Sequence, residues 1–284
     1  EGRAVQEYLD RRQIKKSTAV RFGMGASLDA WDVLLTALTK KGYTKSELLD
    51  AGLVVQNKNG GLYDKFRNRL MLPVIDVRGD VVAFGSRVLD KSEPKYMNSS
   101  ETPVYSKRRV LYGLNLAKKS KRPNIILCEG NLDIVTLHQA GFDNAVASMG
   151  TALTVEQTRL LSRFTKELVL CYDNDNAGKI ATERALQILN SEFSVKVLQL
   201  PRRLVDGEYI KQDADDFIKL QGPDAFERLL NGSENGVEFR MAQIAGKYDL
   251  KDDEARIAYC GEVSELLASL PGAVEREIYT GRAA

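Results

Sequence analysis

Six carboxylates in this chain occur close after apolar segments, at spacings that would let them share one site. They lie in the segments CEGNLD, YDNDNAG and KQDADDF and are Glu129, Asp133, Asp173, Asp175, Asp213 and Asp215. Two like charges about 4 Å apart repel by roughly 4 kcal/mol at an effective dielectric constant near 20. Several such pairs would strain a protein of ordinary stability, so either protons or metal ions must neutralise the cluster. Proton sharing suits a pair of carboxylates, whereas metal ions are the simpler answer for five or six. Hard divalent cations prefer oxygen ligands, and we expect two or more Mg²⁺ or Mn²⁺ ions that serve phosphate chemistry.

Two of these carboxylates end apolar runs that are typical of buried strands. Residues 125–128 run into Glu129, and residues 168–172 run into Asp173. Because such runs alternate with helical patterns, we expect a mostly parallel sheet flanked by helices, with its ligand crevice beyond the carboxyl ends of the strands. Glu129 and Asp173 should therefore face the same crevice.

This alternation predicts an α/β domain over residues 123–222, followed by a C-terminal helical subdomain over residues 223–284. The expected strands are 125–128, 145–148, 168–172 and 195–200, and the expected helices are 131–140, 154–164, 177–190 and 216–220. Asp215 precedes the last of these helices and could simply be its N-cap. Asp133 could likewise be a solvated helix residue.

Residues 1–122 have a different pattern, which predicts a basic α+β subdomain. Helical periodicity covers residues 1–10 and 28–39, a short capped helix is expected over 44–50, and a β-hairpin over 70–84. Up to residue 122 the chain has 24 Lys and Arg against 13 Asp and Glu, a net charge of +11, and the remainder has 17 against 26, a net charge of −9. A basic half beside an acidic half is suited to holding a polyanion over a metal centre, the alternative being uneven surface charge.

The composition is that of an ordinary globular protein, with 43% hydrophobic and 28% charged residues. No apolar run is long enough to span a membrane and the N-terminus lacks a signal-peptide core, so we expect a cytoplasmic protein without a membrane partner. The first residue is Glu rather than Met, which suggests a piece of a longer protein.

The cysteines and the single histidine do not predict a zinc site. Cys128, Cys171 and Cys260 are scattered, no CxxC pair occurs, and His138 is the only histidine. We expect thiols in a reducing compartment, a packing or surface role for His138, and no zinc in this chain.

A strand that ends in Glu, followed by one that ends in Asp-x-Asp, resembles the signature of the TOPRIM domain. DnaG-type primases, topoisomerases and some nucleases share that domain. Three further segments narrow the resemblance: RNRLMLPVIDVRGDVVAFGSRVLD, PKYMNSSETPVYSKRRVLYGLNLA and EGNLDIVTLHQAGFDNAVASMGTALT. Together they resemble the RNA polymerase region, or catalytic core, of bacterial DnaG-type primases, in order and over nearly the whole chain.

The resemblance implies roles for individual residues. Glu129, Asp173 and Asp175 match the family's catalytic carboxylates, and Asp133, Asp213 and Asp215 complete its metal-binding set. Glu129 would bind a metal or act as a general base, and the residues alone do not separate these roles. The residues that match those holding template, primer or nucleotide are Arg67, Arg69, Arg87, Lys95, Asn98 and Lys107.

The implied activity is that of a DNA primase, which makes RNA primers from ribonucleoside triphosphates on single-stranded DNA during replication. The implied partners are the template, the RNA primer, the triphosphates and a replicative helicase, the last contacted through a domain absent from this chain. Two alternatives stay open on the sequence. One is a metal-dependent nuclease or topoisomerase that uses the same carboxylates, and the other is a non-catalytic nucleic-acid-binding mediator.

Overall fold

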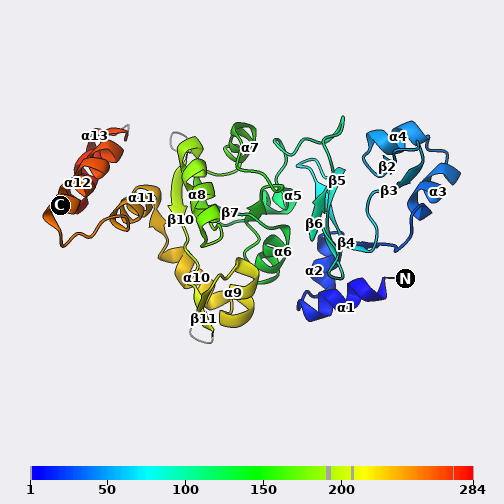
Figure 1. Cartoon of the computed structure of the whole chain (residues 1–284), viewed down its shortest axis with the longest axis horizontal. Helices are drawn as coiled ribbons and strands as arrows, with labels where there is room; N and C mark the ends of the chain where they lie inside the picture. The colour runs from blue at the N-terminus through cyan, green and yellow to red at the C-terminus, as the bar shows by residue number, and fades with distance from the viewer. Residues whose placement is uncertain (1, 190–192, 206–207, 271, 284) are drawn as a thin grey trace.

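The computed structural model describes residues 2–189, 193–205, 208–270 and 272–283. Figure 1 shows three parts along the long axis of the molecule, with an N-terminal α+β part at one end, a sheet flanked by helices in the middle and C-terminal helices at the other end. This arrangement confirms the expected fold class. Within the described residues, no helix has the length and apolar character needed to cross a membrane.

The N-terminal part is built on a four-stranded antiparallel sheet in the order β1-β4-β5-β6. Its elements are α1 (Arg3–Arg11), α2 (Lys16–Arg21), β1 (Gly25–Ser27), α3 (Val33–Lys40), α4 (Lys45–Asp50), β2 (Val54–Gln56), β3 (Leu62–Asp64), β4 (Arg69–Ile75), β5 (Val81–Val88) and β6 (Tyr96–Asn98). The predicted hairpin is β4–β5, and the carboxylate of Asp76 closes its turn by accepting three backbone N–H groups at 2.8–3.0 Å. The short helix predicted over 44–50 has the expected capping box between Thr44 and Glu47.

The helix predicted over residues 28–39 begins only at Val33, so its start was wrong. The carboxylate of Asp64, on strand β3, accepts the backbone N–H groups of Leu34 and Leu35 at 2.7 and 2.9 Å. A side chain far along the sequence therefore satisfies the free N–H groups at the helix start.

The central part is a five-stranded sheet in the order β13-β10-β9-β7-β8, parallel except for β13. Its elements begin with α5 (Leu114–Ala117), β7 (Ile125–Cys128), α6 (Asn131–Gln139), β8 (Ala145–Ala147), α7 (Val155–Leu161), β9 (Glu167–Leu170), α8 (Asn176–Leu189), β10 (Ser194–Val197), the hairpin β11 (Arg203–Val205) and β12 (Glu208–Ile210), and α9 (Ala214–Gln221). The alternation expected from the sequence is thus present, although β10 ends three residues earlier than predicted.

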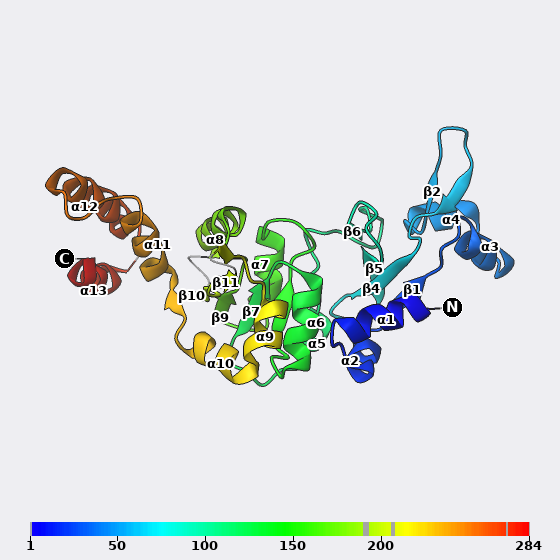
Figure 2. The same ribbon diagram turned by 60° about the horizontal axis from the view of Figure 1, so that its bottom comes forward.

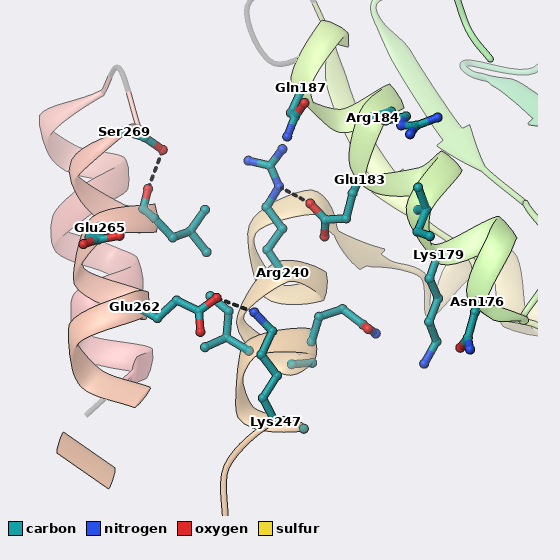
Figure 3. Close-up of a pocket in the computed structure, with 16 residues that line it drawn as sticks. Asn176, Lys179, Glu183, Arg184, Gln187, Arg240, Lys247, Glu262, Glu265 and Ser269 are labelled. Carbon is teal, nitrogen blue, oxygen red and sulfur yellow. Dashed lines mark hydrogen bonds and ion pairs between the residues drawn. The ribbon is translucent and has the colours of Figure 1, made fainter. Parts of the chain in front are cut away.

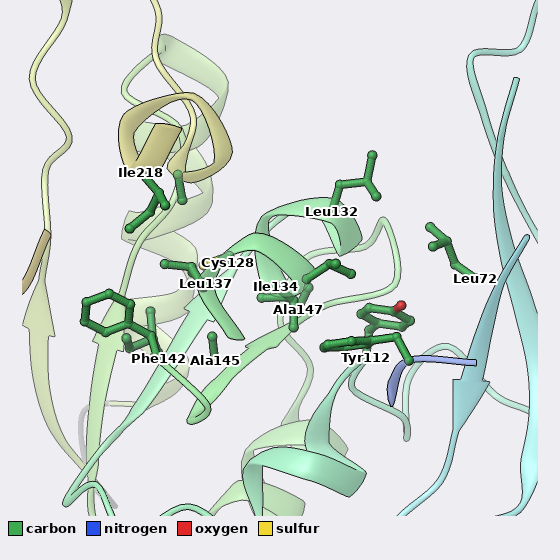
Figure 4. Close-up of a cluster of buried hydrophobic side chains, with 14 of the residues drawn as sticks. Leu72, Tyr112, Cys128, Leu132, Ile134, Leu137, Phe142, Ala145, Ala147 and Ile218 are labelled. Atoms are coloured by element: carbon green, nitrogen blue, oxygen red, sulfur yellow. The ribbon is translucent and has the colours of Figure 1, made fainter. Parts of the chain in front are cut away.

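Strands β7, β8 and β9 are buried on both faces, which explains why their sequences are almost continuously apolar. Along β7, Ile126 and Cys128 pack into a core with α6 and α9, whereas Ile125 and Leu127 pack into a second core with α7 and α8. Figure 4 shows the first core, into which Leu72 of strand β4 also points. The N-terminal part and the central sheet therefore share hydrophobic packing.

The packing extends the central sheet beyond the expected boundary at residue 222. Helix α10 (Pro223–Asn231) buries Phe226 against Phe142 and Phe217, and strand β13 (Glu234–Asn235) pairs with β10. We propose on this basis that the central domain ends after Asn235.

The C-terminal helices are α11 (Gly236–Ala245), α12 (Asp253–Ala268) and α13 (Ala273–Ala283), and they have a small core of their own. Figure 2 shows them projecting from the end of the sheet. An ion pair between Arg240 and Glu183, at 3.4 Å, connects α11 to α8. A second ion pair, between Lys247 and Glu262, connects the residues just after α11 to α12. Both pairs line a cleft of about 1110 Å³ (Figure 3).

Candidate active site

The carboxylates of the YDNDNAG segment are held by a tight loop between β9 and α8. The side chain of Asp175 accepts the backbone N–H of Gly178 at 2.8 Å. A Cβ atom at Gly178 would lie only 1.9 Å from the carbonyl oxygen of Asp173. Because no side chain fits there, the glycine of this segment is required for the loop that presents Asp173 and Asp175.

Glu129 lies beside this loop, as the parallel strands predict. The backbone N–H of Asp173 donates to Oε1 of Glu129 at 3.4 Å. Burial and the neighbouring charge of Asp173 raise the pKa of Glu129 above its ordinary value. The first two segments therefore meet at the carboxyl edge of the sheet.

The third segment reaches the same edge through helix α9. Asp133, in the first turn of α6, accepts the backbone N–H of Asp215 at 3.2 Å. Burial raises the pKa of Asp133 well above its ordinary value, and the negative charge of Asp213 adds to that effect. Burial also raises the pKa of Asp213, and the carboxylate of Asp173 adds to that effect. All three segments thus act on one another electrostatically.

Asp213 and Asp215 have different roles in helix α9. The N-cap of α9 is Asp213, whose Oδ1 accepts the backbone N–H of Asp216 at 2.7 Å. Asp215 lies inside the helix and is 3% exposed, so the alternative that it caps the helix was wrong. The helix begins at residue 214 because the Asp213 carboxylate supplies the cap.

Asp215 is already neutralised by the protein. Its Oδ2 accepts a hydrogen bond from Nη1 of Arg12 at 2.8 Å and pairs with Lys219, and its Oδ1 accepts from the hydroxyl of Thr136. With both oxygens engaged, Asp215 connects α1, α6 and α9. This placement favours a supporting role for Asp215 over direct metal binding.

Two residues of the site were not predicted from the sequence. One is Arg12, described above, and the other is Lys211, whose Nζ pairs with Asp173 and lies 2.8 Å from Oδ2 of Asp175. Both act through ion pairs between distant segments. The only sequence signal for Lys211 is its position two residues before Asp213.

The donor set fits a divalent cation. One carboxylate oxygen from each of Asp213, Asp215 and Asp216 lies within 4.8 Å of the others, although both oxygens of Asp215 are already paired within the protein. Burial raises the pKa values of Glu129, Asp133 and Asp213, and the charges of neighbouring carboxylates add to that effect. Hard oxygen donors with excess negative charge are what Mg²⁺ and Mn²⁺ prefer.

Of the predicted nucleic-acid residues, Arg87 and Asn98 lie in strands β5 and β6 of the antiparallel sheet, and Lys95 directly precedes β6. Arg87 lies between the rings of Tyr8 and Tyr96, with its Cζ atom 5.3 and 5.0 Å from the ring centroids. Lys95 is exposed and lies 5.8 Å from the ring of Tyr96. Asn98 donates to the carbonyl oxygen of Met149 at 3.3 Å, which places β6 against the loop that follows β8.

The other three predicted residues are more dispersed. Arg69 is only 5% exposed and donates to the carbonyl oxygen of Pro94 at 3.0 Å, while its Nη1 has no hydrogen-bond partner within the described residues. Arg67 stacks on Trp31, with Cζ 4.2 Å from the ring centroid. Lys107 lies close enough to Lys65 to help lower the pKa of Lys65, after the effect of burial. The structure therefore gathers the cations over one subdomain without bringing all of them to one point.

The fold and the acidic edge define a TOPRIM-type domain joined to a basic sheet subdomain. The family model for the N-terminal domain of the DNA primase catalytic core matches residues 1–118, a Toprim-like model matches residues 126–218, and the model for the DnaB-helicase binding domain of primase matches residues 237–284. The chain belongs to the family of DnaG-type primase catalytic cores.

Individual relatives agree with this assignment. The DNA primase of Clostridium acetobutylicum is 43% identical over 280 residues, which cover 98% of this chain and 45% of that protein. A solved DnaG primase catalytic domain bound to ssDNA has a TM-score of 0.84 at 32% identity, covering 99% of this chain and 90% of that one. A DNA primase domain from Pseudomonas aeruginosa has a TM-score of 0.82 at 35% identity, covering 99% and 87%.

These comparisons do not favour a nuclease, a topoisomerase or a non-catalytic mediator. The chain spans about half the length of the curated relatives it matches. One expectation needs correction: helicase contacts were assigned to a domain absent from this chain, yet residues 237–284 match the helicase-binding model. No motif in the sequence of this segment had indicated helicase binding.

Substituting Asp133 tests how unfavourable it is to bury its negative charge beside other carboxylates. Because the folded protein raises the pKa of Asp133, its ionised form is unfavourable, and the metal-free protein should become more stable as the pH falls through the folded-state pKa. Asp133→Asn keeps the acceptor for the Asp215 N–H and removes the charge. At pH 8 in EDTA it should melt higher than the parent chain, by about 2–4 °C for each kcal/mol relieved, and the gap should shrink toward pH 5.

The matched control is Asp29→Asn, because Asp29 is exposed. Its melting temperature should follow that of the parent at every pH. A gap between Asp133→Asn and the parent that is absent at pH 8, or that widens as the pH falls, would contradict the assigned repulsion.

Proposed function

We propose that this chain is the catalytic part of a DNA primase, which synthesises RNA primers from ribonucleoside triphosphates on single-stranded DNA during replication. The observation that carries the proposal is the meeting of three acidic segments at the carboxyl edge of one sheet, with a basic sheet packed beside that edge. This juxtaposition suits a reaction in which a polyanionic template must lie next to metal-bound phosphates.

Glu129, Asp133, Asp173, Asp175 and Asp213 would hold Mg²⁺ or Mn²⁺, and Asp215 would support them through its contacts with α1 and α6. Such ions lower the pKa of an attacking 3′-hydroxyl and stabilise the leaving pyrophosphate. The number of ions is expected to be two or more.

Glu129, Asp173 and Asp175 are the proposed catalytic residues. The raised pKa of Glu129 makes it the member of this set best able to accept a proton near neutral pH. The loop that Gly178 permits orients Asp173 and Asp175 toward the same point. The residues thus position the reacting groups and compensate charge at the edge of the sheet.

The template, the primer and the nucleotides would be held by Arg67, Arg69, Arg87, Lys95, Asn98 and Lys107. The aromatic rings beside Arg87 and Arg67 offer flat faces on which unpaired bases can stack. Among solved relatives, one is a catalytic domain bound to ssDNA, and another, from Mycobacterium tuberculosis, is in complex with a double-stranded DNA oligomer with a 6-nucleotide overhang. The same class of ligand is proposed for this chain.

A replicative helicase is the proposed protein partner, through residues 237–284. The support is the match to the helicase-binding family model together with exposed apolar side chains on α12 and α13. Ile257 and Val274 are 73% and 70% exposed and offer apolar area to a partner. A primase of this kind would work in the cytoplasm, where the chromosome is copied.

Asp173→Asn tests the catalytic assignment. Replacing a metal-binding carboxylate by a neutral amide should reduce nucleotide incorporation on a single-stranded template by roughly 100-fold or more, since metal stabilisation of the transition state is worth several kcal/mol. Template binding, followed by fluorescence anisotropy, should stay nearly unchanged. Asp29→Asn is the matched control, and primer synthesis preserved in Asp173→Asn would refute the proposal.

Arg87→Ala tests the template surface. Loss of one phosphate contact should weaken binding of a labelled single-stranded oligonucleotide and reduce the slope of log K against log salt by about 0.7. Arg163→Ala, at an exposed position after α7, removes the same charge elsewhere and should leave the slope as it was. An unchanged slope in Arg87→Ala would remove this residue from the proposed surface.

Ile257→Glu with Val274→Glu tests the helicase surface. If α12 and α13 dock on a DnaB-type helicase, placing charges on their exposed apolar side chains should weaken the complex about tenfold or more in a biolayer binding assay. Val20→Glu, at a position 70% exposed in α2, is the control. Equal helicase binding by the double variant and the control would exclude this surface.

A further inference from the structure

Lys211 occupies a position between the two carboxylates of the Asp-x-Asp loop. Its Nζ pairs with Asp173 and lies 2.8 Å from Oδ2 of Asp175. Within the part of the chain that the structure describes, the ion pairs of Asp173 and Asp175 are all made to this one ammonium group. One ammonium group therefore pairs with both carboxylates.

The segment that carries Lys211 fixes where its side chain can reach. Strand β12 ends at Ile210 and the Asp213 cap of helix α9 follows two residues after Lys211, while Gln212 between them is 5% exposed. The backbone is therefore anchored on both sides of Lys211. Its side chain, in contrast, is 45% exposed, and the ammonium group lies at the end of a flexible four-carbon chain.

The second carboxylate pairing in the site shows the opposite character. Asp215 pairs with Arg12 and Lys219, and its side chain is 4% exposed. Arg12 and Lys219 are 27% and 17% exposed, less than the 45% of Lys211, so this pairing is the more enclosed of the two. Asp173 and Asp175 are 24% and 39% exposed and face solvent together with Lys211. Their partner is free to exchange with an ion from solution.

A lysine ammonium and a divalent cation cannot share these two carboxylates at low cost. Both are positive, and both seek the same carboxylate oxygens within a few ångströms of one another. A lysine side chain is ordinarily an ammonium ion at neutral pH, and the two ion pairs of Lys211 are those of such a cation. A metal ion that enters must therefore displace it.

We propose that Lys211 is an exchangeable counter-ion of the metal site. It holds Asp173 and Asp175 in place before a divalent cation binds, it is displaced by that cation, and it sets the metal concentration at which the site fills. The inference rests on the metal-binding role proposed for Asp173 and Asp175, but it does not depend on primer synthesis.

The test is the affinity for Mn²⁺ alone, measured by isothermal titration calorimetry and by the electron paramagnetic resonance signal of free Mn²⁺. Lys211→Met removes the competing charge, so its apparent Kd for Mn²⁺ should fall about three- to tenfold below that of the parent chain, the range expected for two exposed ion pairs. Lys179→Met is the matched control. Lys179 lies on α8 near the site and makes no ion pair within the described residues, and its loss should change Kd less than about twofold.

Lys211→Arg gives an independent arm that keeps the charge. Arginine binds carboxylates more strongly through its paired N–H groups, so this variant should bind Mn²⁺ no more tightly than the parent. Melting curves in EDTA establish that each variant is folded. If Lys211→Met does not fold without metal, the Lys211→Arg arm decides, and Mn²⁺ binding tighter than that of the parent would overturn the proposal.

Equal or weaker Mn²⁺ binding by folded Lys211→Met would also overturn it. The result is separable from the proposed function. Tighter binding by Lys211→Met in a protein that makes no primers would retain the counter-ion role and reject the primase activity. Primer synthesis with no change in Mn²⁺ affinity would reject the counter-ion role alone.

Discussion

Repulsion between carboxylates at the carboxyl edge of the central sheet is the constraint on which the rest of the structure depends. Strands buried on both faces bring Glu129 and the Asp173 loop to the edge, and helix α9 brings Asp213. The fold accommodates the charge in two ways. It raises the pKa of Glu129 and of Asp213 through burial, and it supplies Lys211 as a cation. The carboxylates still carry more negative charge than Lys211 neutralises. A divalent cation would compensate the remaining charge.

An ion pair also joins the N-terminal part of the molecule to the central part. Arg12, from the N-terminal part, reaches the buried Asp215 of the central part, and Tyr8 on the same helix lies against both Arg12 and Arg87. The proposed template surface and the acidic edge are therefore joined by three successive side-chain contacts, from Arg87 to Tyr8, from Tyr8 to Arg12 and from Arg12 to Asp215.

Much of this was predictable because it follows from local patterns. Apolar runs that end in an acidic residue predict strand ends, and the order of elements in the central domain was correct in kind if not at every boundary. What the sequence did not reveal depends on partners far apart along the chain. Asp64 sets the start of α3, and Lys211 meets the Asp-x-Asp loop through tertiary contacts that have no periodic signature. The burial of Arg69 was also beyond sequence reasoning, because a charged residue in a basic stretch gives no sign that a sheet will enclose it.

The free edges of strands β8 and β10 in the central sheet are each covered in part by another segment of the chain. The backbone of Tyr112 pairs with that of Ala147 on β8, at 2.9 and 3.0 Å, and β13 pairs with the outer side of β10. Strand edges with free N–H and C=O groups invite other chains to add to a sheet and so promote aggregation. The two residues of β13 thus do more than extend the sheet: a shortened chain that stopped before Glu234 would leave β10 uncovered and prone to self-association.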